Sequence, residues 1–74
     1  MSRDEWAAKA EENIEQWGLQ DPETLLLAMQ EEMGELAQAH LEARDEDGDP
    51  TRVAEELDDL GALCVQLERA LEGD

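Results

Sequence analysis

The chain has 74 residues, which is enough for one domain, so we expect a single domain over residues 1–74. Its 22 acidic and 5 basic residues give a net charge of −17, which excludes nucleic-acid binding through a basic patch and disfavours anionic membrane surfaces. No segment approaches the ~18 consecutive apolar residues of a membrane span, and the first residues contain no apolar secretory core, so we expect a soluble, cytoplasmic protein.

The acidic excess also bears on the salt in which the protein works. Lys9 is the only lysine, beside four arginines. An acid-rich, lysine-poor surface is typical of proteins in concentrated salt, where the screening length falls to about 3 Å at about 1 M. We therefore favour a halophilic source over an ordinary acidic helical protein.

The candidate core is small. Trp6 and Trp17 are the only aromatic residues, so the core must be built from leucine, alanine, methionine and valine. A short chain of this kind buries a modest fraction of its surface and gains by covering an apolar face with another copy of itself. We expect a homo-oligomer, either a homodimer or a dimer of dimers.

Three helices are predicted in chain order, and no alternating strand pattern occurs. The first spans residues 3–17 and carries a weak apolar stripe of Trp6, Ala10, Ile14 and Trp17. The second spans residues 22–42, begins at Asp21-Pro22, and carries a stripe of Leu26, Met29, Met33, Leu36 and His40. The third spans residues 50–72 and begins at Asp49-Pro50. The fold class is all-α, a compact three-helix antiparallel bundle.

The third helix has the clearest apolar pattern, with steps of four and three residues at Val53, Leu57, Leu60, Cys64, Leu67 and Leu71. This spacing favours packing against a neighbouring antiparallel helix. Cys64 is then a small buried apolar residue rather than a reactive thiolate. His40, on the stripe of the second helix, is expected to be partly buried.

Two pairs of carboxylates lie beside these stripes: Glu32 with Glu35, and Glu56 with Asp59. Residues three apart share one side of a helix, so antiparallel packing would gather both pairs. Carboxylates about 5 Å apart repel by roughly 3 kcal/mol per pair at an effective dielectric near 20. Oxygen ligands alone indicate Mg²⁺ or Mn²⁺ rather than zinc. The alternative is chance, because acids are so frequent that the first helix holds a similar pair, Glu12 and Glu15.

Two segments that contain these pairs resemble a known family. The first runs from Trp17 through Pro22-Glu-Thr-Leu-Leu-Leu to Glu32-Met-Gly-Glu-Leu-Ala37, and the second is Val53-Ala-Glu-Glu-Leu-Asp-Asp-Leu60. These segments resemble the MazG-like all-α nucleoside triphosphate pyrophosphohydrolases in the order of the two carboxylate motifs, in the residues around them and in the gap of roughly 20 residues between them. The resemblance covers residues 17–71, and the chain lacks the fourth helix usual in that family.

The resemblance implies hydrolysis of a nucleoside or deoxynucleoside triphosphate to the monophosphate and pyrophosphate. The metal-binding and catalytic positions of the family match Glu32, Glu35, Glu56 and Asp59, which would hold Mg²⁺, with Mn²⁺ as the alternative. Glu31 or Glu55 would lie in the outer shell, or an inner carboxylate would accept the proton of the attacking water.

The resemblance also implies contacts to the nucleotide, with no nucleic-acid polymer as a partner. Trp17 would stack on the base or, alternatively, only cover the end of the core. Phosphate contacts would come from Arg44, Arg52, Arg69 or Gln66. The other functional class is a non-catalytic acidic helical interaction or regulatory module with a MazG-like fold.

Overall fold

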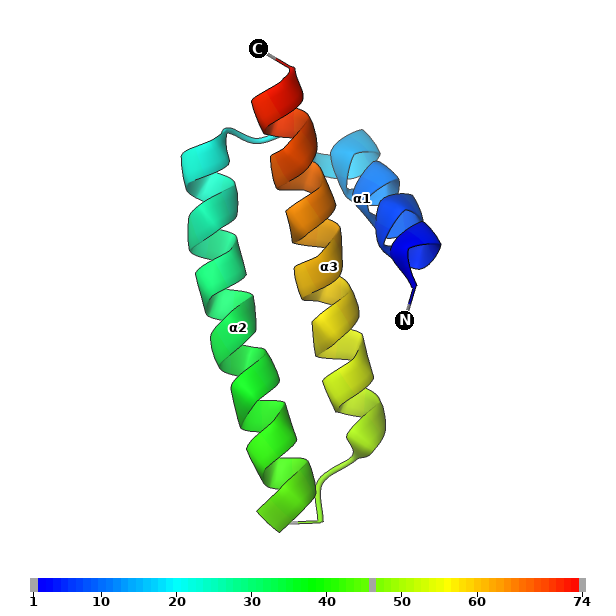
Figure 1. Cartoon of the computed structure of the whole chain (residues 1–74), viewed down its shortest axis with the longest axis vertical. Helices are drawn as coiled ribbons and strands as arrows, with labels where there is room; N and C mark the ends of the chain where they lie inside the picture. Colours follow the sequence, from blue (N-terminus) through cyan, green and yellow to red (C-terminus); the bar gives the residue numbers. More distant parts are fainter. Residues whose placement is uncertain (1, 46, 74) are drawn as a thin grey trace.

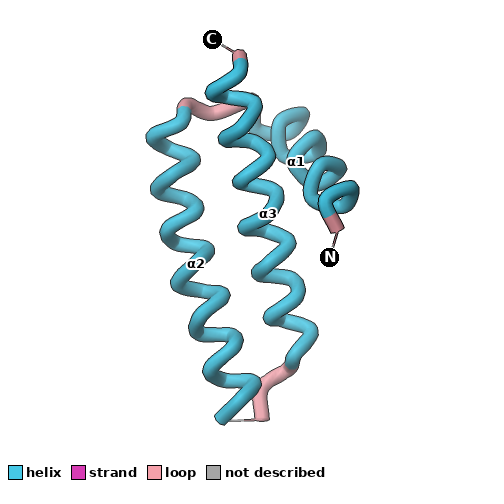
Figure 2. The backbone as a smooth tube through the Cα atoms, viewed as in Figure 1, coloured by secondary structure: helices cyan, strands magenta, loops and turns pink. Residues whose placement is uncertain are grey.

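A computed structural model describes residues 2–45 and 47–73 and contains three helices: α1 (Arg3–Trp17), α2 (Pro22–Asp45) and α3 (Pro50–Glu72) (Figure 1). The described residues form no strand, which confirms the all-α prediction (Figure 2). Helix α2 ends at Asp45, later than the predicted residue 42. In the described part of the chain, no helix combines the length and apolar content of a membrane span.

Side-chain caps explain where the helices begin. Ser2, Asp21 and Asp49 accept hydrogen bonds of 3.2, 2.7 and 2.9 Å from backbone N–H groups in the first turns of α1, α2 and α3. Such caps satisfy N–H groups that have no partner inside the helix. Gly18 ends α1 at φ +80° and donates its N–H to the carbonyl of Ile14. The two Asp-Pro starts are therefore confirmed.

Helices α2 and α3 form an antiparallel hairpin, and α1 packs against α3 alone (Figure 1). Among the described residues the backbones of α1 and α2 do not approach each other closely, so α3 is the central helix of an elongated molecule of 44 × 23 × 18 Å. This arrangement is more open than the predicted compact bundle.

The core consists mostly of small side chains. Leu25 is the one large side chain that is fully buried among the described residues, and the other buried apolar residues are Ala10, Ala39, Ala62 and Ala70. Alanines allow two helix backbones to approach closely, and the carboxylate-bearing sides of α2 and α3 then lie along their interface. This contact positions the candidate site.

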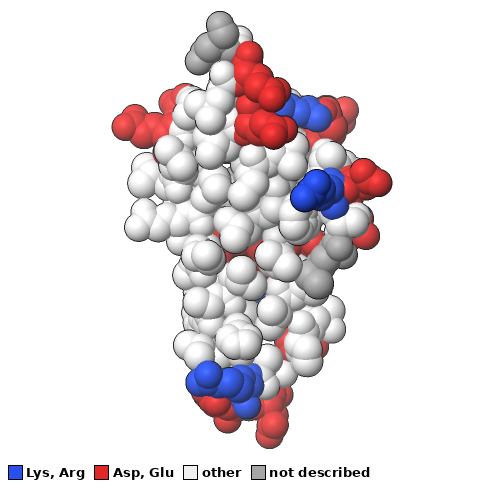
Figure 3. Space-filling view, viewed as in Figure 1, with Lys and Arg blue, Asp and Glu red and all other residues white. Residues whose placement is uncertain are grey.

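The prediction that the apolar stripes are buried in the internal helix contact is wrong for several of their residues. Leu26, Met33 and Leu71 are 53, 56 and 60% exposed, and both His40 and Cys64 are exposed. The other stripe members are half-buried, so each stripe is covered only in part: Met29, Leu36, Val53, Leu57, Leu60 and Leu67. Figure 3 shows one face of the molecule with few charged side chains at its centre.

Candidate metal centre

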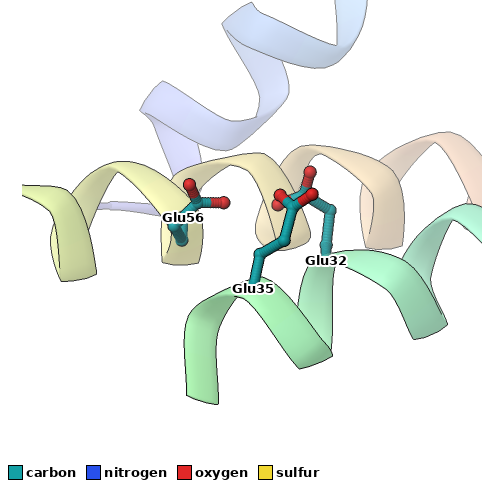
Figure 4. A group of neighbouring side chains, drawn as sticks. All are labelled: Glu32, Glu35 and Glu56. Atoms are coloured by element: carbon teal, nitrogen blue, oxygen red, sulfur yellow. The ribbon is translucent and has the colours of Figure 1, made fainter. Parts of the chain in front are cut away.

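Antiparallel pairing of α2 and α3 gathers three of the four predicted ligands. One carboxylate oxygen from each of Glu32, Glu35 and Glu56 lies within 4.8 Å of the others. Figure 4 shows Glu32 and Glu35 rising from α2 with their carboxylates close together, and Glu56 reaching toward them from α3. The predicted convergence of carboxylates is therefore present for these three residues.

Two of these carboxylates are placed where water cannot fully solvate them. The Oε2 atoms of Glu32 and Glu56 are buried and have no hydrogen-bond partner. Burial raises the pKa of Glu32 to about 7, and the adjacent carboxylate of Glu56 and the charges of Glu35 and Asp59 act in the same direction. Buried carboxylate oxygens without donors fit a hard divalent cation, which prefers oxygen ligands.

Asp59, the fourth predicted ligand, lies next to this cluster but has a different partner. Its carboxylate forms an ion pair with Lys9 of α1, and this hydrogen bond raises the pKa of the Lys9 ammonium. Asp59 and Glu32 line one pocket of about 270 Å³, which α3 shares with α1 and α2. The described lining residues are Lys9, Asn13, Ala28, Glu31, Glu32, Asp59 and Leu63.

The two outer-shell candidates occupy different places. Glu31 lines the pocket, whereas Glu55 is exposed on α3 and does not line it. Of the two, Glu31 is therefore the one positioned to act on a ligand in this pocket.

The predicted substrate contacts are scattered. Arg52 donates to Glu42 at 3.1 Å and lies 3.9 Å from Glu56, so it borders the carboxylate cluster. Of the other candidates, Gln66 contacts the pocket residue Asn13, and the rest do not line the pocket. Arg44 pairs with its neighbour Asp45, Arg69 pairs with Glu11, and Trp17 is 68% exposed at the end of α1; Gln66 is buried and accepts from Asn13.

Lys9 and Asn13 of α1 are pocket residues that the sequence analysis missed. Lys9 lies three residues after Trp6, and Asn13 lies three residues after Ala10. All four residues therefore share one side of α1 with the apolar stripe. The sequence did contain a signal for this contact. Lys9 is the only lysine of an acidic chain, and it lies on the side of the helix that carries the apolar stripe.

The raised pKa of Glu32 predicts a pH-dependent stability. Because the native chain holds a proton on Glu32 that the unfolded chain releases near the ordinary value of 4.5, the free energy of unfolding falls as pH rises from 4.5 to about 7. Glu32→Gln removes this contribution. We expect the free energy of unfolding of the natural chain to fall relative to that of Glu32→Gln as pH rises to about 7, and the difference to stay constant above that pH. Urea unfolding without divalent cations, at constant ionic strength, measures this difference. If the difference in free energy of unfolding between the two proteins does not change with pH, the pKa of Glu32 is not raised.

Comparisons of the chain with protein-family models, with curated proteins and with solved structures give no match.

Proposed function

We propose that this chain is a MazG-like enzyme that hydrolyses a nucleoside or deoxynucleoside triphosphate to the monophosphate and pyrophosphate. The observation that carries the proposal is the gathering of Glu32, Glu35 and Glu56 from two helices beside a pocket. The resemblance of the two carboxylate-bearing segments to that family supports a triphosphate as the ligand. The acidic lining requires a cation between the protein and any phosphate group.

The cation would be Mg²⁺, with Mn²⁺ as the alternative, held by the three glutamates and by Asp59. Buried, unpartnered oxygens on Glu32 and Glu56 support this assignment because a cation would supply the partner they lack. When bound, Mg²⁺ neutralises charge on the phosphates and lowers the pKa of a coordinated water.

The side chains around the pocket have separable tasks in this proposal. Glu31, which is exposed and lines the pocket, would accept a proton from water. Ala28 and Leu63 provide the apolar part of the lining and would contact uncharged atoms of the ligand.

The test is pyrophosphate release from a panel of ribonucleoside and deoxyribonucleoside triphosphates with Mg²⁺, in low and high salt. We expect release from at least one nucleotide, and none when EDTA replaces Mg²⁺. If Mg²⁺ binds but no nucleotide is hydrolysed, the chain is the non-catalytic interaction module instead.

We further propose that the exposed residues of the apolar stripes bind a second copy of this chain. We define the apolar face as Leu26, Met33, His40, Cys64 and Leu71, all exposed. Two chains of net charge −17 repel strongly, so they can associate only where charges are few, and Figure 3 shows such a region. The chain's own core, with one large fully buried side chain among the described residues, also gains from this cover.

The apolar face predicts how self-association responds to charge and salt. Met33→Glu places a carboxylate within the face, and we expect it to give monomers where the natural chain forms dimers. Because salt screens the repulsion between chains, the natural dimer should strengthen from about 0.1 M to about 2 M KCl. Sedimentation velocity measures both effects.

Ala8→Glu adds the same charge at an exposed position of α1 and is the matched control. A Met33→Glu protein that dimerises as well as Ala8→Glu would rule out this face as the interface.

A further inference from the structure

Lys9 is a cation placed directly against a predicted metal ligand. It projects from α1 and pairs with Asp59 of α3, and the two side chains are 40 and 36% exposed at the pocket. Polar contacts flank this pair along the same helix. Trp6 Nε1 donates to Asp58 at 2.9 Å, and the Asn13 amide donates to Gln66 at 3.0 Å. Helix α1 therefore has attachments to α3 that do not depend on Lys9.

The other positively charged side chains near α3 have other partners or line another groove. Arg52 pairs with Glu42, Arg69 pairs with Glu11, and Arg3 lines a separate groove together with Arg69. Lys9 is thus the one positively charged side chain among the described residues that line the acidic pocket. A phosphate group in this pocket would find no other protein cation within it.

We propose that Lys9 has two anionic partners in turn: it holds Asp59 when the carboxylate cluster lacks a metal, and it binds a phosphate oxygen once Asp59 has turned to the metal. This inference rests on the proposed function. Asp59 is attracted more strongly by a divalent cation beside Glu32 than by one ammonium group, because the charge is doubled. The ammonium group sits on a flexible four-carbon stem and can swing to a nearby anion.

The proposal makes Lys9 a substrate-positioning residue and also a competitor of the metal. These two roles have opposite consequences when Lys9 is replaced. Loss of the ammonium removes a positive charge that opposes metal binding, and it also removes the protein's own cation for phosphate. Loss of any nearby positive charge shifts the two affinities in these directions, so the size of both effects, compared with the loss of a charge outside the pocket, identifies Lys9 as a direct partner.

The test measures two affinities of Lys9→Gln in the full chain, and neither requires turnover. Mn²⁺ binding without nucleotide is followed by the electron paramagnetic resonance signal of free Mn²⁺, and binding of inorganic pyrophosphate at saturating Mg²⁺ is followed by calorimetry. We expect Mn²⁺ to bind about threefold to tenfold more tightly than to the natural chain, and pyrophosphate about tenfold more weakly.

Two variants serve as controls. Arg3→Gln removes one positive charge outside the acidic pocket, and Trp6→Phe removes a neighbouring α1–α3 hydrogen bond without a change of charge. Each should change either affinity by less than about twofold. Melting curves of all variants verify that α1 is still folded in place.

Each remaining outcome decides against this proposal, against the proposed function, or against both. If Lys9→Gln leaves Mn²⁺ affinity unchanged or lowers it, Lys9 does not compete with the metal. If pyrophosphate affinity is unchanged, Lys9 does not bind phosphate. If the natural chain binds no Mn²⁺, this proposal and the proposed function both fail. If it binds Mn²⁺ and pyrophosphate as expected but hydrolyses no nucleotide, only the proposed function fails.

Discussion

Glu56→Gln is expected to bind Mg²⁺ about a hundredfold more weakly than the natural chain and to release no pyrophosphate, while keeping its fold. Glu56 is the one member of the carboxylate cluster that comes from α3, and its Oε2 is buried without a partner. A neutral amide offers a weaker oxygen ligand and cannot balance the charge of the cation. Calorimetry with Mg²⁺ and the pyrophosphate assay measure the two losses.

The same substitution should stabilise the protein when divalent cations are absent. It removes one of the charges that repel Glu32 and Glu35, so the midpoint of urea unfolding should rise in EDTA. Glu12→Gln is the matched control, because Glu12 and Glu15 have the same spacing on α1 but are exposed and lie outside the cluster. Equal Mg²⁺ affinity for Glu56→Gln and Glu12→Gln would end the metal assignment.

Gly61→Ala is expected to destabilise the protein, although alanine is the better helix former by about 1 kcal/mol. A Cβ at Gly61 would lie 2.3 Å from Cδ2 and 2.5 Å from Cε2 of Trp6. The indole is rigid and is held by its hydrogen bond to Asp58, so α1 itself must shift. We expect a net loss of about 1–3 kcal/mol in the free energy of unfolding, measured by urea denaturation.

Gly34→Ala provides the control for helix propensity. A Cβ at Gly34, in the middle of α2, meets no atom within 4 Å, so this substitution should stabilise the protein by about 1 kcal/mol. In a Trp6→Ala background the clash disappears, and Gly61→Ala should then stabilise as well. If Gly61→Ala is as stable as Gly34→Ala in the natural background, the close packing of Trp6 on α3 is wrong.

The helix boundaries and the carboxylate cluster were predictable because each depends on local chemistry. An aspartate followed by proline specifies a helix start through one hydrogen bond and one fixed dihedral angle. Glutamates three residues apart on one helix stay together whatever packs against them, so Glu32 and Glu35 needed only an antiparallel neighbour to meet Glu56.

What the stripes pack against was not predictable by the same reasoning. A periodic row such as Leu26, Met29 and Met33 shows that one side of a helix is apolar, but not which surface covers it. The residues that are fully covered within the chain include Ala39, Ala62 and Ala70, whose small side chains give little periodic signal. The Lys9 contact with Asp59 joins residues 50 positions apart and depends on how α1 crosses α3, which no spacing within one helix encodes.

Because the backbones of α1 and α2 approach α3 closely but not each other, the breadth of the acidic pocket is determined by two independent crossings. A bulkier or smaller side chain on the α1 side of α3 would move one wall and leave the paired glutamates undisturbed. Under the proposed function, changes where α1 crosses α3 would therefore alter the size of ligand that fits and the Lys9–Asp59 pair, while Glu32, Glu35 and Glu56 keep their common contact.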